Sequence, residues 1–219
     1  MSGEAESKRQ QAKGGGIAST EGYVFELSGG SLCLDFANTV DSRLSAEPQE
    51  RLGDYGDLVG WSVQSELLTA GQARRLLAAA EREVGRAAAV LRRARELREA
   101  IFEVFSARAR EAAAAAAAID TLNKELPKAL TRLRLVEDGA DYRTEWEDED
   151  ALDRMLWPVV RSAAELLTSD ESSRVRVCAA ETCAWLFLDR SKNRSRRWCD
   201  MAVCGNRDKV RRFRQRSRS

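Results

Sequence analysis

The spacing of apolar residues changes several times along the chain, and each change predicts a different element. Residues 23–43 (YVFELSGGSLCLDFANTVDSR) join a strand-like run, through a Gly-Gly turn, to an apolar run that fits a strand or a helix. From Asp57 to Ala80 the apolar residues recur with a period of 3.6, which predicts helices, with Thr69 as the N-cap of the second. The predicted buried face of the first apolar run consists of Leu32, Leu34, Phe36 and Val40.

Residues 83–126 are rich in alanine, arginine, glutamate and leucine, which all favour helices. The run Ala112–Ala118 is interpreted as a helix surface, and Pro127 predicts a helix boundary. The following residues alternate between apolar and polar around Asp138-Gly139, which predicts a β-hairpin. Helical spacing returns over residues 148–167, where the predicted core positions are Leu152, Met155, Leu156, Val159, Val160, Ala163 and Leu167.

These elements predict an α+β fold in two domains. Residues 1–18 are polar and mixed in charge, so we expect a disordered leader. A helix-rich domain that includes the β-hairpin is expected over residues 19–168. The polar segment Thr168–Arg174 is the predicted domain break, and residues 174–219 are expected to form a small second domain.

The charge of the chain is divided between these two domains. The protein has 36 basic and 35 acidic residues, but residues 174–219 hold 14 of the basic and four of the acidic ones, a net of +10. The 22 basic and 31 acidic residues before them give a net of −9. Arginines outnumber lysines by 30 to six throughout, so arginine in the second domain is not by itself evidence of guanidinium-specific recognition.

Several classes of protein are excluded by residues that the sequence lacks. It contains no histidine, which excludes Ser-His-Asp and Cys-His triads and histidine-ligated metals. No paired constellation of other side chains indicates catalysis, and Cys33 between two leucines is interpreted as a core residue, so no enzymatic activity is expected. We also see no secretory signal and no apolar run of about 18 residues, and therefore expect a cytoplasmic protein without a membrane partner.

Four of the five cysteines form two equal pairs in the basic segment. Each pair has C-x4-C spacing, and fifteen residues separate the pairs. Thiolates on two short turns suit tetrahedral Zn²⁺, and four of them leave no open position, so we predict one structural zinc ion. Isolated buried cysteines and disulfides are the alternatives. The predicted ligands are Cys178, Cys183, Cys199 and Cys204.

The residues around these cysteines predict a small zinc knuckle made of a β-hairpin and a C-terminal helix. AWLFLD is the predicted strand, RSKN the turn and RSRRWC the returning strand. Gly205 is expected to turn the chain sharply away from the metal, and Asn206 to cap the helix or, alternatively, to read a base edge. Val210 and Phe213 are expected to face the hairpin, and Trp198 to pack there or stack on a base.

Two motifs carry a resemblance to a known family. Cys204-Gly205-Asn206-Arg207, after the spaced cysteines, resembles the CGNR zinc finger. LCLDFANTVDSR, residues 32–43, looks like the opening of the ABATE domain that usually precedes that finger. The resemblance extends from about Gly22 over nearly the whole remaining chain, and it implies a bacterial, stress-associated transcription regulator.

The basic residues of the second domain predict a surface for nucleic acid, with DNA as the expected partner. Each basic side chain can neutralise a phosphate, which makes binding steeply dependent on salt. A basic tail that docks on the acidic N-terminal domain is the alternative. The predicted contacts are Arg190, Lys192, Arg194, Arg196, Arg197, Asn206, Arg207, Lys209, Arg211, Arg212 and Arg214.

A polar pocket in the N-terminal domain is a candidate site for a small-molecule ligand. Asp35, Asn38, Asp41 and Arg43 lie among apolar residues, and capping or turn chemistry is the alternative interpretation. The leading hypothesis is a DNA-binding transcription regulator whose N-terminal domain senses a ligand or forms a homodimer. A protein-interaction module and an RNA-binding protein are the alternative hypotheses.

Overall fold

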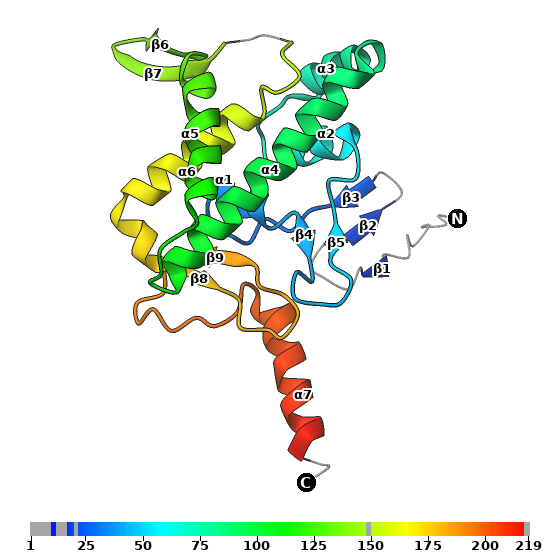
Figure 1. Ribbon diagram of the computed structural model, residues 1–219, viewed down its shortest axis with the longest axis vertical. Helices are drawn as coiled ribbons and strands as arrows, with labels where there is room; N and C mark the ends of the chain where they lie inside the picture. Colours follow the sequence, from blue (N-terminus) through cyan, green and yellow to red (C-terminus); the bar gives the residue numbers. More distant parts are fainter. Residues whose placement is uncertain (1–9, 12–16, 20–21, 148–149, 217–219) are drawn as a thin grey trace, which may run out of the picture.

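Helices form most of the chain shown in Figure 1. The computed structural model describes residues 10–11, 17–19, 22–147 and 150–216. The predicted α+β fold, helix-rich with short antiparallel strands, is confirmed. The helices are α1 (Leu32–Ala37), α2 (Tyr55–Gln64), α3 (Ala70–Arg82), α4 (Val84–Ala109), α5 (Ala116–Leu130), α6 (Leu156–Thr168) and α7 (Asn206–Arg216), with a 3-10 helix η1 (Asp170–Arg174) and a π-helical turn η2 (Met201–Gly205).

The strands are short and pair only with antiparallel neighbours within the described residues. They are β1 (Gln10–Gln11), β2 (Ile17–Ser19) and β3 (Gly22–Val24) in one sheet, and the pairs β4 (Val40–Asp41) with β5 (Gln49–Glu50), β6 (Leu133–Asp138) with β7 (Asp141–Trp146), and β8 (Val175–Val177) with β9 (Leu186–Leu188). The β6–β7 turn contains Gly139 with φ of +67°, which confirms the predicted hairpin.

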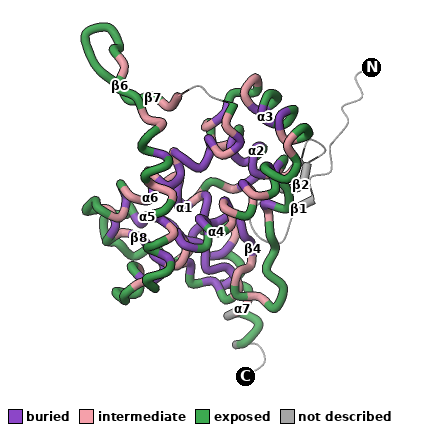
Figure 2. Tube along the Cα trace, turned by 45° about the horizontal axis from the view of Figure 1, so that its top comes forward, coloured by how far each residue is buried: buried purple, intermediate pink, exposed green. Residues whose placement is uncertain are grey.

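Helix α4 forms the centre of the main core. It contacts α1, α2, α5 and α6, and its residues Leu97, Ile101 and Phe105 are completely buried. The apolar run that fitted a strand or a helix is helix α1, and its Phe36 packs against Trp61 with ring centroids 4.9 Å apart. In Figure 2 the buried residues gather in the middle of the molecule, whereas α7 and the β6–β7 hairpin are largely exposed.

Local capping fixes where two of the helices begin. Helix α2 starts with a capping box in which the Asp54 side chain accepts from Asp57 N at 2.9 Å. Helix α3 starts with a second box, in which Thr69 Oγ1 accepts from Gln72 N at 3.2 Å, and the predicted N-cap is confirmed. Each cap satisfies amides that would otherwise lack partners, and contributes about 1 kcal/mol.

Two predictions on the central helices are wrong. Pro127 lies inside α5, which continues to Leu130, because the completely buried Ala129 holds the last turn against the core. The alanine run is helical only from Ala116 onward, and there Ala116 and Ala117 are exposed whereas Ala118 is buried in the core. Helix α4 ends where Glu111 adopts φ of +54°, so the first alanines connect α4 to α5 despite their helix propensity.

The N-terminal region is bounded by the predicted leader and by the predicted domain break. The disordered leader is predicted over residues 1–18, most of which lie outside the described residues. The predicted break at residues 168–174 is occupied by the end of α6 and by η1. The strands on its far side share the main core, since Val175, Leu186 and Leu188 are buried in it. None of the described helices is long and apolar enough to span a membrane.

Candidate metal centre and basic surface

The structure brings together the four cysteines that were predicted as metal ligands. All four are buried, and their sulfur atoms lie within 4.8 Å of one another. Cys199 Sγ lies 3.7 Å from Cys183 Sγ and 3.6 Å from Cys204 Sγ. Four thiolates at about 2.3 Å from a tetrahedral metal ion have sulfurs about 3.8 Å apart, whereas a disulfide requires about 2.05 Å. The geometry therefore fits a metal ion and not disulfides.

Two turns present these cysteines. Cys178 follows β8 directly and donates its backbone N–H to Trp185 O at 2.8 Å, which ties it to the strand opposite. Of the second pair, Cys199 precedes η2 and Cys204 lies within it, and the N-cap Asp200 accepts from Val203 N at 2.6 Å. Cys204 N also donates to the backbone oxygen of Asp200. Each pair is therefore held by backbone hydrogen bonds that do not involve a metal.

A small apolar cluster surrounds the sulfurs. Trp185 and Phe187 are buried beside the cysteines. Trp198 is partly buried against this cluster, which agrees with the packing role that was predicted for it as one of two alternatives. The Arg196 guanidinium covers the Phe187 ring at 4.6 Å and donates to Trp198 O at 2.9 Å. Such an enclosure excludes water, which favours thiolate binding to a cation.

The ionisation of the thiols depends on their mutual contacts. The hydrogen bond with Cys183 lowers the pKa of Cys178. The hydrogen bond with Cys178 raises the pKa of Cys199, and burial adds to that rise. Four thiolates at such short separations repel one another, so a divalent cation is the group that suits this donor set.

The predicted strand partner within this region is wrong. Strand β9 pairs with β8 on its N-terminal side, with Val175 opposite Leu188, and the segment after β9 forms no strand. That segment folds instead around Asp189, whose buried carboxylate accepts from Ser191 N and Arg196 N, both at 2.9 Å. Burial raises the pKa of Asp189, but these hydrogen bonds outweigh it and hold the pKa below its usual range.

The N-terminal domain anchors strand β9 through residues 29–40. Asn38 is buried, and its side-chain amide exchanges two hydrogen bonds with the backbone of Leu186, at 2.8 and 2.9 Å. Leu188 N donates to Gly29 O at 2.8 Å. Trp185, next to the cysteines, donates its indole N–H to Val40 O at 2.9 Å. The metal centre is therefore fixed to the main core.

The candidate ligand-pocket residues make contacts within the protein. Asp35 Oδ1 accepts from Gly29 N at 2.8 Å, and burial raises the Asp35 pKa to about 6. Arg43 donates to Glu99 at 2.7 Å and lies 4.0 Å over the Phe102 ring. The buried Asp41 binds Tyr23 and Arg51, and Asn38 anchors β9. These contacts favour the structural alternative, and a ligand pocket at Asp35, Asn38 and Arg43 stays a prediction. Cys33 is completely buried in the core, as predicted.

The start of the C-terminal helix also differs from the prediction. Asn206 has helical φ and ψ and donates its side-chain N–H to Ala202 O at 2.9 Å, so it is not an N-cap. The cap is Asp200, because the helical path begins at Met201. Gly205 makes no sharp turn; it is a buried helical residue whose missing Cβ leaves room for the Met201 side chain.

Helix α7 exposes the two apolar residues that were expected to face the finger. Val210 is 50% exposed and Phe213 is 72% exposed, so this prediction is wrong. The inward position belongs to Asp208, which is 7% exposed and binds Arg211 at 2.8 Å. The apolar cluster around the cysteines is formed by Trp185, Phe187, Trp198 and Val203, and no described residue of α7 belongs to it.

The predicted nucleic-acid contacts fall into two groups. Arg190 binds Glu171, Arg211 binds Glu181 and Asp208, and Arg196 binds backbone oxygens of the finger. Asn206 bonds to Ala202 O, and six further basic side chains are exposed and make no ion pair with the described residues. The side chain of Arg212 lies outside the described part of the chain. The second group consists of Lys192, Arg194, Arg197, Arg207, Lys209 and Arg214.

Two family models match the chain. Residues 30–170 match the family model ABATE, which is described as "Putative stress-induced transcription regulator". Residues 174–217 match the family model of the CGNR zinc finger. Both matches agree with the resemblance seen in the sequence. No curated protein matches the chain.

Proposed function

The chain belongs to the ABATE family and carries a CGNR zinc finger, and from this premise we propose that it is a DNA-binding transcription regulator. The observation that carries the proposal is a group of exposed basic side chains that make no ion pair with the described residues, placed on α7 and on the loop beside the four cysteines. The proposal concerns DNA binding; ligand sensing and homodimerisation by the N-terminal domain stay predictions.

Zn²⁺ is the metal that we propose for the four cysteines. Cys178, Cys183, Cys199 and Cys204 would hold it through their sulfurs, and the ion would supply structural support without an open position for chemistry. The residues between the metal ligands and α7 then set the orientation of that helix. Asp200 caps η2, and η2 leads into α7, so the start of the basic helix is fixed relative to the metal centre.

Helix α7 suits the role of the DNA-contacting element. It projects away from the body of the protein (Figure 1) and exposes Arg207, Lys209 and Arg214. An isolated helix can enter the major groove, and basic side chains along it neutralise phosphates. We propose Asn206 and Arg207, at the exposed start of the helix, as candidate contacts to base edges, because Asn and Arg pair with adenine and guanine.

A mobility-shift titration with duplex DNA across a salt series tests the proposal. We expect binding that weakens steeply with salt, and expect the variant Lys209→Gln/Arg214→Gln to lower the slope of log affinity against log salt by about 2. Arg74→Gln is the matched control, since Arg74 is an exposed arginine of α3 at the opposite end of the molecule. Absence of binding at low salt would sink the proposal.

Protein binding is the second candidate function, and the exposed Val210 and Phe213 favour it. A partner that covers this face of α7 would bury both side chains. Pull-downs with the full-length protein that are insensitive to nuclease, and that are lost in Val210→Ser, would support this function. A comparison of duplex DNA with RNA of the same sequence separates the RNA-binding alternative.

A further inference from the structure

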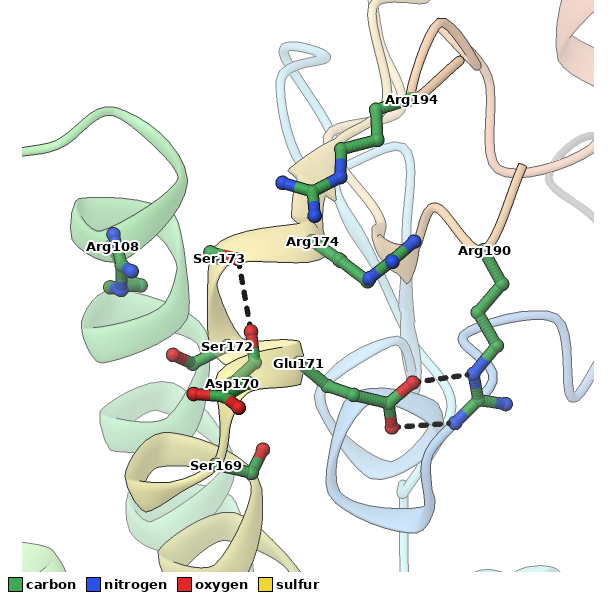
Figure 3. Close-up of a pocket in the computed structure, with 9 residues that line it drawn as sticks. All are labelled: Arg108, Ser169, Asp170, Glu171, Ser172, Ser173, Arg174, Arg190 and Arg194. Carbon is green, nitrogen blue, oxygen red and sulfur yellow. Dashed lines mark hydrogen bonds and ion pairs between the residues drawn. The ribbon is translucent and has the colours of Figure 1, made fainter. Parts of the chain in front are cut away.

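A polar hollow lies between the N-terminal domain and the zinc finger. Figure 3 shows it at the end of α4, beside η1 and the loop after β9. Its volume is about 790 Å³. The residues that line it come from three separate parts of the chain and are Arg108, Ser169, Asp170, Glu171, Ser172, Ser173, Arg174, Arg190 and Arg194.

The charges around the hollow are unbalanced. Four arginines face two acids, which leaves a net of two positive charges. Glu171 is already engaged, because Arg190 donates two hydrogen bonds to its carboxylate at 2.9 and 3.0 Å. Arg108, Arg174 and Arg194 make no ion pair with any described residue. The hollow therefore keeps an excess of positive charge, and a bound anion would offset it.

The arginines are held by the fold and do not belong to a loose tail. Arg108 lies in the last turn of α4, and Arg174 ends η1 directly before β8. The loop that carries Arg190 and Arg194 is closed by the buried Asp189, which accepts from the backbone on both sides of Arg194. Their positions around the hollow are therefore set before any ligand arrives.

We propose that this hollow binds a phosphate-bearing ligand. Planar guanidinium groups bind phosphate oxygens with two parallel hydrogen bonds, and serine hydroxyls add further donors. The lining of arginine, serine and acid side chains offers no large apolar surface, which argues against an apolar ligand. A phosphate-bearing ligand in this hollow would connect the end of α4 to the finger, and would stabilise the finger loop in its present position.

Pyrophosphate provides a direct probe of the site in the full-length protein at low salt and without DNA. By isothermal titration calorimetry we expect Arg108→Gln, Arg174→Gln and Arg194→Gln each to weaken binding by about tenfold, the loss of one charge-assisted interaction. Arg110→Gln is the matched control, because Arg110 is an exposed arginine two residues from Arg108 that does not line the hollow. We expect it to change the affinity by less than about twofold.

A variant with the opposite expected effect guards against misfolding as an explanation. Glu171→Gln removes a negative charge and releases Arg190, so we expect it to strengthen pyrophosphate binding by about threefold. A general loss of structure cannot produce tighter binding. Thermal unfolding of each variant shows that it is folded before it is titrated.

Titration with DNA distinguishes the two sources of the phosphate. If pyrophosphate binds and Arg108→Gln leaves DNA affinity unchanged, the ligand is a free phosphorylated molecule. If Arg108→Gln weakens both, and pyrophosphate competes with DNA, the hollow holds a phosphate of the DNA backbone. The proposal is overturned if pyrophosphate does not bind and Arg108→Gln leaves DNA binding intact, or if Arg110→Gln has the same effect as Arg108→Gln. Since pyrophosphate is tested alone, a failure of DNA binding does not decide this result.

Discussion

Arginines occur in the central helix α4 and in the C-terminal finger, and their surroundings differ. In α4, Arg98 is 4% exposed and donates to Glu50 at 2.7 Å and to Glu99 at 2.8 Å. In the finger, Arg207 and Arg214 are exposed and make no ion pair with the described residues. The same side chain thus stabilises the core of one region and remains available to a partner in the other.

The acids of the finger explain this difference. Asp189 closes a loop, Asp200 caps η2, and Asp208 and Glu181 both bind Arg211. Within the described part of the chain, all four acids of residues 174–219 are therefore engaged, either by backbone amides or by Arg211. The division of charge seen along the sequence is preserved in the structure, because two of the four acids of the finger bind backbone amides and the other two share Arg211.

Loss of the metal should have the largest effect, because it removes the support of the finger and leaves the main core in place. Cys199→Ser removes one ligand, and structural zinc sites contribute on the order of 10 kcal/mol to folding. We expect about one zinc ion per chain in the unaltered protein by elemental analysis, and loss of both zinc and DNA binding in the variant. Cys33→Ala is the control, because Cys33 is buried in the main core and outside the cluster. Unchanged metal content in Cys199→Ser would refute the site.

Breaking an arginine pair of the core should have the next largest effect. Arg98→Met removes the closest ion-pair partner of Glu50 and one of the two arginine partners of Glu99, and we expect the free energy of unfolding to fall by about 2 to 3 kcal/mol. Arg214→Met, at an exposed position, should change it by less than about 0.5 kcal/mol. Urea unfolding measures both variants. Equal losses would mean that the two kinds of arginine do not differ in their contribution to stability.

Removing the hydrogen bonds between Asn38 and strand β9, which connect the two regions, should have a smaller effect on stability. Asn38→Ala leaves the buried N–H and C=O of Leu186 without their partner, which should cost about 2 kcal/mol. Asn206→Ala is the control, since Asn206 is exposed and bonds only to its own helix in the described chain. Hydrogen exchange at Leu186 locates the effect, and protection there that is unchanged in Asn38→Ala would contradict the anchoring role.

Features that depend on neighbouring residues could be predicted from the sequence. The Thr69 cap, the Asp138-Gly139 hairpin and the two C-x4-C pairs each have their determinants within a few residues. Contacts between distant residues could not. Asn38 and Leu186 are 148 residues apart, and no local pattern indicates that a side-chain amide completes the edge of β9.

The same limit explains the remaining errors. Strand β8 consists of only three residues between the predicted domain break and the first cysteine. Such a short segment gives no clear alternation, so its pairing with β9 cannot be predicted from spacing alone. The hollow at Arg108 is formed by residues from three parts of the chain, and only the folded structure brings them together. Local sequence patterns therefore predict caps, turns and ligand pairs, but they do not predict contacts between distant residues.

The smallest expected effect concerns Asp35, a half-buried acid of α1. Asp35 makes no ion pair with the described residues, and burial raises its pKa to about 6 from 3.8. The folded protein therefore binds this proton more tightly than the unfolded chain does, so stability should fall as pH rises from about 4 to about 6. Since one pKa unit corresponds to about 1.4 kcal/mol and relaxation reduces the effect, we expect Asp35→Asn to stabilise the protein by about 1 to 2 kcal/mol at pH 7. The amide oxygen can still accept from Gly29 N, and urea unfolding at pH 4 and pH 7 should show the gain only at the higher pH. A gain of equal size at both pH values would assign the stabilisation to packing and not to the buried charge.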